Sequence, residues 1–209
     1  MAFALVESGK ITKLMNGNKG IKIGDNQYPS SFFTTIYSEA ERNAAGVYTI
    51  EFDNTNKKSE EYYVNTDITY AYDSSANKVK GTYGTATAKS ITDIKWTQTE
   101  IDAGKAPEGA DTNTVKVEGL KTIKKRMIDN QCASILAPSD WMATKAFEEG
   151  GDVESGWKTW RASVRTKCNS MQTQIDNAAD VDALAALFTY TVQEDKSVTR
   201  PLGEFPVKE

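Results

Sequence analysis

The stretch Ile135-Leu-Ala-Pro-Ser-Asp-Trp-Met142 lies between two long helical patterns and decides how the chain folds. Pro138 cannot continue a helix, whereas Ser139 or Asp140 can cap a new one. The first pattern therefore ends here, and a short helical segment carrying Trp141 follows. We predict that the chain folds back at this corner, so that the two long helices form an antiparallel hairpin.

The second pattern is an apolar stripe with the period of a straight α-helix. Its members are three or four residues apart, so they fall within an arc roughly 100° wide over about five turns. A strict heptad would instead impose a left-handed supercoil. Because Asp152 is a suitable N-cap, we predict a globular packing helix over about residues 153–177. The stripe consists of Trp157, Trp160, Val164, Cys168, Met171 and Ile175.

The first pattern predicts a helix that ends near Pro138 and is apolar on one side. We interpret a basic cluster on its other side as a solvated face. Both cysteines lie on apolar faces, so we expect buried thiols, with a disulfide between the two helices as the alternative. The apolar side comprises Leu120, Ile123, Met127, Ile128, Cys132, Ile135 and Leu136, the basic cluster comprises Lys121, Lys124, Lys125 and Arg126, and the second cysteine is Cys168.

One charged pair can fix the corner of the predicted hairpin. Arg161 lies about 40° and Arg165 about 80° around the second helix from Trp157, on the flank of the apolar stripe. In an antiparallel hairpin the turn at Asp140 reaches that flank. We expect a bidentate contact between Arg161 and Asp140, beside Trp141.

The N-terminal part of the chain favours short strands. Apolar residues alternate over residues 47–53 and again on both sides of the polar loop 73–77, as in a hairpin. Ser38-Glu-Ala-Glu41 is a capping-box pattern, which predicts a short helix that stops at Gly46. Pro29 favours an extended segment over residues 28–33.

Three tyrosines of this region, Tyr70, Tyr72 and Tyr83, are candidates for a surface that binds sugar or protein. Tyrosine offers a stiff contact area with a polar tip. Aromatic residues also favour strands without any binding role, and this structural interpretation comes first.

These patterns together predict an α+β fold. We expect a small antiparallel β-rich N-terminal domain over residues 1–96 and a linker or long loop over residues 97–113. An excursion within one domain is the alternative for that segment. A helical C-terminal domain over residues 114–209 would contain the hairpin, a short helix capped by Asp180, and an extended tail.

Composition removes several classes of function. The 209 residues carry a net charge of -4 and include no histidine, the commonest general base and transition-metal ligand. Acidic pairs and glycine turns lack the spacing of catalytic or phosphate sites, so we predict no catalytic, cofactor-binding or metal site and no enzyme. The charge argues against nucleic acid as a partner.

The chain also lacks the patterns of a membrane or secreted protein. No apolar run approaches the ~20 residues of a membrane span. The first residues do not resemble a signal peptide, so we expect the product to stay where it is made unless it is carried out within a larger assembly.

The corner block, followed by Trp160-Arg-Ala-Ser-Val-Arg-Thr-Lys167, resembles a helical C-terminal domain of tail proteins from tailed bacteriophages. The pattern there is a helix ending in Leu-Leu-Ala-x-Thr/Ser-Asp-Trp, a variable loop, and Tyr-Arg-x-x-Val/Leu-Arg. Trp160 replaces the usual tyrosine, and the loop 148–152 lacks the proline often seen. Residues 38–47 resemble the upstream segment of such proteins, and residues 199–206 resemble the ends of structural proteins from marine tailed phages.

This resemblance implies a virion structural protein of the tail, a fibre or baseplate component that is made in the host cytoplasm and acts in particle assembly and host attachment. It implies other tail proteins as partners and a homo-oligomer, a trimer by analogy with tail fibres. A tail-fibre assembly chaperone, absent from the mature virion, is the alternative. A tip that binds host-surface glycan through the tyrosines is a third interpretation, and a wall-degrading enzyme is the least favoured.

Overall fold

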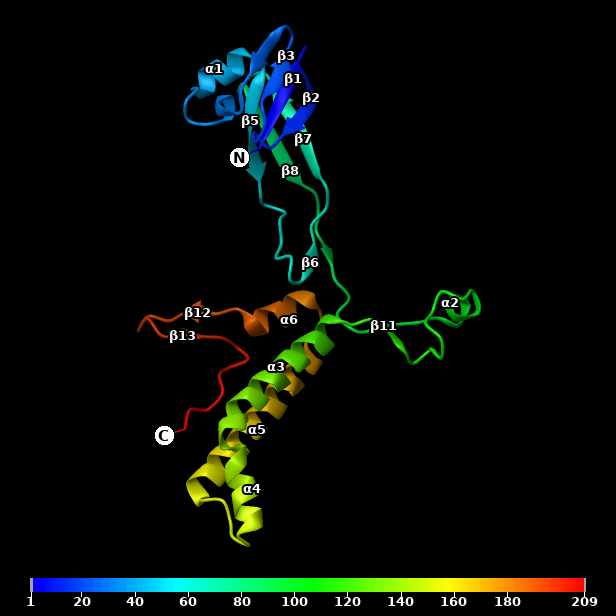
Figure 1. The fold of residues 1–209 in the computed structure, drawn as a ribbon, viewed down its shortest axis with the longest axis vertical. Coiled ribbons are helices and arrows are strands. Elements are labelled where there is room, and N and C mark those ends of the chain that lie inside the picture. Colours follow the sequence, from blue (N-terminus) through cyan, green and yellow to red (C-terminus); the bar gives the residue numbers. More distant parts are fainter. Residues whose placement is uncertain (1, 209) are drawn as a thin grey trace. The chain divides into compact units, whose positions relative to one another are not determined.

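The computed structural model describes residues 2–208, and the chain divides into two compact units between Thr87 and Ala88. Strands dominate the first unit, whereas the long helices belong to the second (Figure 1). The predicted α+β class, with β structure before helices, is confirmed.

The first unit contains a five-stranded sheet in the order β2-β1-β5-β8-β7. A small hairpin, two short helical segments and one further short strand accompany it. The sheet strands are β1 (Phe3–Glu7), β2 (Lys10–Met15), β5 (Val47–Asp53), β7 (Ile68–Asp73) and β8 (Lys78–Tyr83); the hairpin is β3 (Ile21–Ile23) with β4 (Asn26–Tyr28), and the remaining elements are η1 (Ser30–Phe33), α1 (Glu39–Ala44) and β6 (Tyr63–Val64), with β9 (Thr87–Ala88) at the boundary between the units.

One strand pairing in this sheet is parallel. The hairpin of β7 with β8 is antiparallel as predicted, and so are both pairings of β1. Strands β5 and β8 run parallel, with Ile50 opposite Val79. The prediction of a purely antiparallel region is therefore wrong at this pairing, because alternation reports which face of a strand is apolar and not its direction.

Apolar clusters pack on both faces of the sheet. Phe3, Leu5 and Val47 meet the side chains of the 21–33 segment on one face. Tyr48 and Val79 belong to the cluster on the other face. The edge strands β2 and β7 lie close to each other, so the sheet curves around this second cluster.

Local capping chemistry is confirmed in α1, and the expectation for the preceding segment is wrong. Ser38 and Glu41 form both bonds of the capping box, and Gly46 follows the helix with φ at +80°. Residues 30–33, expected to be extended, form the 3₁₀ turn η1. This turn buries both Phe32 and Phe33, whose ring centroids lie 5.5 Å apart, and that burial outweighs the local preference of Pro29.

The second unit is built on two long helices (Figure 1). Two short two-stranded pairs, β10 with β11 and β12 with β13, belong to it as well. Its elements are β10 (Ile94–Lys95), α2 (Gln98–Asp102), β11 (Val115–Val117), α3 (Leu120–Leu136), η2 (Ala137–Ser139), α4 (Asp140–Glu148), α5 (Ser155–Asn177), α6 (Val181–Phe188), β12 (Thr191–Val192) and β13 (Val198–Thr199).

Helices α3 and α5 pack side by side as the predicted antiparallel hairpin (Figure 1). The chain reverses in the loop between α4 and α5, however, and not at the Pro138 corner as predicted. Val164, Cys168, Met171 and Ile175 are buried, as the stripe predicted, whereas its first two members are half-buried tryptophans. Each fully buried aliphatic side chain stabilises such a core by about 1.5–3 kcal/mol. Asp180 caps α6 by accepting from the backbone N–H of Ala183 at 2.8 Å.

Lys124 corrects the prediction that the basic cluster on α3 is wholly solvated. It is buried, and its ammonium lies 4.3 Å from the centroid of the Phe188 ring. The reason is its spacing, since Lys124 follows Leu120 and precedes Ile128 by four residues each and so belongs to the buried row of the helix. Lys125 forms an ion pair with Asp176 at 2.8 Å.

The segment 97–113, predicted as a linker or long loop, lies inside the second unit as an excursion. Pairing of β10 with β11 closes its base, and a capping box between Thr97 and Glu100 starts α2. The division of the chain at residues 87 and 88 therefore precedes the boundary we expected at residue 96. Among residues 2–208, no helix combines the length and apolar character needed to cross a membrane.

We expect the Glu100 carboxyl to titrate near pH 2. Hydrogen bonds lower the pKa of this carboxyl from 4.5 to about 2. The bond from Lys116 has the largest effect, and those from the backbone N–H and the hydroxyl of Thr97 add to it. Because the folded pKa lies below the unfolded one, the stabilising effect of Glu100 is complete above pH 4.5 and is lost as the pH falls through 2. An NMR titration of the carboxyl checks this, and Lys116→Gln should move the pKa back toward 4.5. A wild-type value near 4.5 would contradict the prediction.

Candidate functional site

Arg161 of α5 ties together the corner where α3 ends and α4 begins. Its Nη1 donates to the carbonyl of Leu136 at 2.9 Å and to the Ser139 hydroxyl. Its Nη2 donates to Asp140 Oδ1 at 2.5 Å. The predicted contact between Arg161 and Asp140 is thus present, but only one guanidinium nitrogen makes it, because the other serves the corner backbone.

The corner needs this cation because a helix end leaves carbonyl groups without partners. The backbone N–H of Asp140, which an unbroken α-helix would direct to the Leu136 carbonyl, bonds to the Ala137 carbonyl instead. The Ser139 hydroxyl donates to the Leu136 carbonyl at 2.8 Å, and Arg161 donates to the same oxygen. Arg161 is itself buried, so these bonds also offset the cost of removing its charge from water.

The predicted aromatic and basic residues around the corner have different environments. The rings of Trp157 and Trp160 pack edge to face with centroids 5.5 Å apart. The Trp160 indole donates to the carbonyl of Pro206 at 3.0 Å, so residues 200–208, here called the C-terminal segment, lie against α5. Trp141 and Arg165 are exposed, and the structure does not bring either into the Arg161 cluster.

The three candidate tyrosines of the first unit are half-buried and engaged within it. Tyr70 and Tyr72 pack against the apolar cluster that contains Tyr48 and Val79. The Tyr72 hydroxyl donates to the hydroxyl of Tyr48 at 3.2 Å. The ammonium of Lys57 lies 5.4 Å from the centroid of the Tyr83 ring, which leaves less of this ring free for a sugar.

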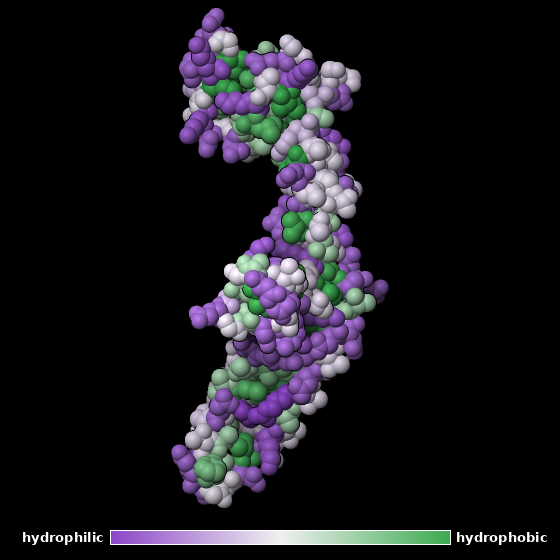
Figure 2. All heavy atoms as spheres, turned by 90° about the vertical axis from the view of Figure 1, so that its right-hand side faces the viewer, coloured by the Kyte–Doolittle hydropathy of each residue, from purple (hydrophilic) through white to green (hydrophobic). Residues whose placement is uncertain are grey.

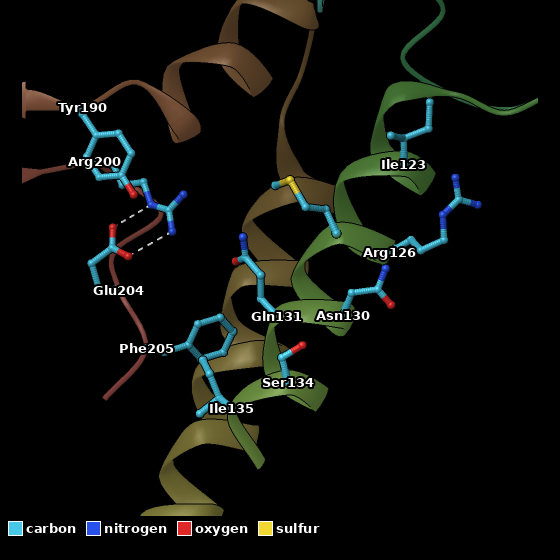
Figure 3. Close-up of a pocket in the computed structure, with 11 residues that line it drawn as sticks. Ile123, Arg126, Asn130, Gln131, Ser134, Ile135, Tyr190, Arg200, Glu204 and Phe205 are labelled. Atoms are coloured by element: carbon cyan, nitrogen blue, oxygen red, sulfur yellow. Dashed lines mark hydrogen bonds and ion pairs between the residues drawn. The ribbon is translucent and has the colours of Figure 1, made fainter. Parts of the chain in front are cut away.

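Sequence reasoning missed a groove of about 780 Å³ on the second unit (Figure 3). One wall is the side of α3 that α5 does not cover, and the other comes from residues 190–205. The signal was present in the sequence, because seven apolar residues form a stripe on α3 wider than one packed helix can bury. The apolar lining residues are Ile123, Met127, Ile135, Tyr190 and Phe205.

Charged side chains on the groove are paired. Arg126 donates to both carboxylate oxygens of Glu118, at 2.6 and 2.7 Å, and holds the pKa of Glu118 below its usual range. Arg200 pairs with Glu204 at 2.8 Å (Figure 3). Burial raises the pKa of Tyr190, and a hydrogen bond with Glu204 adds a smaller increase. Such a groove suits a neutral apolar segment better than an anion.

Within the described part of the chain, no three His, Cys, Asp or Glu side chains cluster so as to hold a metal ion. Comparisons with protein-family models, with curated proteins and with solved structures find no match to this chain. The groove and the corner are therefore the features of the second unit that bear on function. Elsewhere, hydrophobic areas interrupt a mainly hydrophilic surface (Figure 2).

Proposed function

We propose that this chain is a virion structural protein from the tail of a tailed bacteriophage, a fibre or baseplate component that acts in particle assembly and host attachment. The likeness of the corner block and of residues 160–167 to phage tail proteins supports the assignment. The observation that carries it is the open apolar groove beside a hairpin fixed by Arg161. In this proposal the chain holds neighbouring proteins and catalyses nothing.

The groove has the dimensions of a peptide-binding site. From Ile123 to Ile135 the wall runs for twelve residues of helix, or about 18 Å. That length accommodates roughly three turns of a partner helix or five to six residues of an extended strand. Covering a partly exposed isoleucine or methionine stabilises a complex by about 1–2 kcal/mol, so several such contacts suffice for specific association.

The partner in this proposal is another tail protein, and the chain itself forms a homo-oligomer, a trimer by analogy with tail fibres. The protein is made in the host cytoplasm and becomes part of the virion tail. Host-surface glycan is a further ligand in this proposal, bound by the first unit through its tyrosines.

A tail-fibre assembly chaperone, absent from the mature virion, is the second candidate function. The openness of the groove favours it, because a chaperone has to bind an apolar client segment and then release it. Quantitative proteomics of purified virions separates the two: peptides of this chain in intact particles support the structural role, and their restriction to infected-cell lysate supports the chaperone. Absence from both would contradict the phage assignment.

A charge placed in the groove tests its role. Ile123→Asp is expected to reduce association with the partner at least about tenfold, because a carboxylate would lose its hydration against apolar atoms. Ile94→Asp is the matched control, since Ile123 and Ile94 are 40% and 45% exposed and only Ile123 lines the groove. Co-purification of tail complexes and titres of a phage carrying each variant measure the effect. Equal behaviour of the two variants would exclude the groove as the contact surface.

A further inference from the structure

The two cysteines of the chain lie at the same level of the α3–α5 hairpin. The amide of Gln172, one turn after Cys168, donates to the carboxylate of Asp129, about one turn before Cys132. Both thiols are free and buried, and the Cys168 thiol donates at 3.6 Å to Asp129 Oδ1, about one turn from Cys132 on α3. The antiparallel register therefore places Cys132 and Cys168 next to each other between the two helices.

Helix packing also places their backbones at a suitable separation. Helix axes in contact are about 8–10 Å apart, and Cα atoms lie about 2.3 Å from each axis, so Cα atoms that face each other directly are about 3.4–5.4 Å apart. Disulfides span Cα separations of about 4.4–6.8 Å. Closure of a bond here requires rotation of side chains and little movement of the helices.

We propose that Cys132 and Cys168 form a redox-active dithiol that closes to a disulfide between α3 and α5 when it meets a small-molecule disulfide such as oxidised glutathione. One thiolate attacks a sulfur of the small disulfide, forms a mixed disulfide and releases one small thiolate. The second cysteine loses its proton to solvent and attacks the protein sulfur, releasing the other thiolate. Two electrons pass from the protein to the small disulfide, which becomes two thiols.

The surroundings of the pair make closure slow. Burial is the main reason that the pKa of Cys168 is raised to about 11, and the neighbouring Cys132 adds to the effect. The carboxylate of Asp129, which faces Cys168 from α3, also raises the pKa. Only about one thiol in ten thousand is ionised at neutral pH under these conditions, and exchange needs the thiolate. The dithiol therefore persists in a reducing cytoplasm and closes gradually in an oxidising medium. Closure would link α3 and α5 covalently after the chain has folded. This inference does not depend on the assignment of the chain to a phage tail.

The test exposes the reduced, folded full-length protein to excess oxidised glutathione at alkaline pH without denaturant. Peptide mapping by mass spectrometry, without reduction, is expected to find a linked pair of peptides carrying Cys132 and Cys168, two hydrogen atoms lighter than the two free peptides. Thiol titration of the denatured product should fall from two groups to none. The melting temperature followed by tryptophan fluorescence should rise by about 10 °C and return on reduction.

Cys132→Ser is the control, because it leaves a single thiol that can form only a mixed or intermolecular disulfide and should show no such rise. Should this variant fail to fold, the peptide map of the wild-type protein decides alone. Two free thiols after prolonged oxidation, separate glutathione adducts on each cysteine, or links only between molecules would overturn the proposal.

Discussion

Replacing Arg161 with alanine is expected to lower the free energy of unfolding of the helical unit by about 3 kcal/mol. The substitution removes one of the two side-chain donors to the Leu136 carbonyl and the donor to the buried Ser139 hydroxyl, and it leaves a void in the corner. All four tryptophans, at positions 96, 141, 157 and 160, belong to the second unit. Denaturant unfolding followed by tryptophan fluorescence therefore reports this unit in the full-length protein.

Arg165→Ala is the matched control, since it removes the same side chain one turn further along α5 from an exposed position. A change within about 0.5 kcal/mol is expected for it. Asp140→Asn should cost at most about 1 kcal/mol, because the Asp140 side chain is 61% exposed whereas that of Arg161 is 8% exposed. Equal stabilities of the two arginine variants would show that the corner does not depend on Arg161.

Leu202→Ala is expected to destabilise the helical unit by about 3 kcal/mol and to release the C-terminal segment from α5. Leu202 is 0% exposed, although it lies in a stretch rich in proline and glycine. Its backbone N–H donates to Leu187 at 3.1 Å, and its carbonyl accepts from Lys167 at 2.9 Å. The shorter alanine side chain leaves a cavity and loses the buried apolar contacts of Leu202. Without these contacts the two backbone hydrogen bonds are no longer held in place.

The indole N–H of Trp160 provides the local readout for this variant, because it donates to Pro206 in the intact protein. Its NMR signal should move toward that of an indole in water in Leu202→Ala. Val207→Ala is the control, because Val207 is 85% exposed and should change neither stability nor the signal. An unshifted Trp160 signal in Leu202→Ala would mean that Leu202 does not hold the segment.

Several features of the molecule could be predicted because they depend on residues close together in the chain. The spacing from Trp157 to Ile175 predicted α5, and the capping box at Ser38 predicted α1. The fold-back predicted at Pro138 lies instead in the loop after α4, because a proline in the first turn of a new helical segment does not reverse the chain. The pairing of Arg161 with Asp140 followed from the helical angle once the hairpin was assumed. Each of these depends on helix geometry or on a cap, and these act within a few residues.

Tertiary packing decided the remainder, because a periodic pattern reports which face of an element is apolar and not which neighbour covers it. Sequence alternation therefore gave no sign that β5 and β8 run parallel. The wide apolar side of α3 indicated that α5 would leave part of it uncovered, but not which residues would form the opposite wall of the groove. The burial of Lys124 beneath Phe188 depends on where α6 packs, and the level of the two cysteines depends on the register of the hairpin. Local sequence thus determined the helices and their caps, whereas contacts between residues distant in the chain created the groove and brought the two cysteines together.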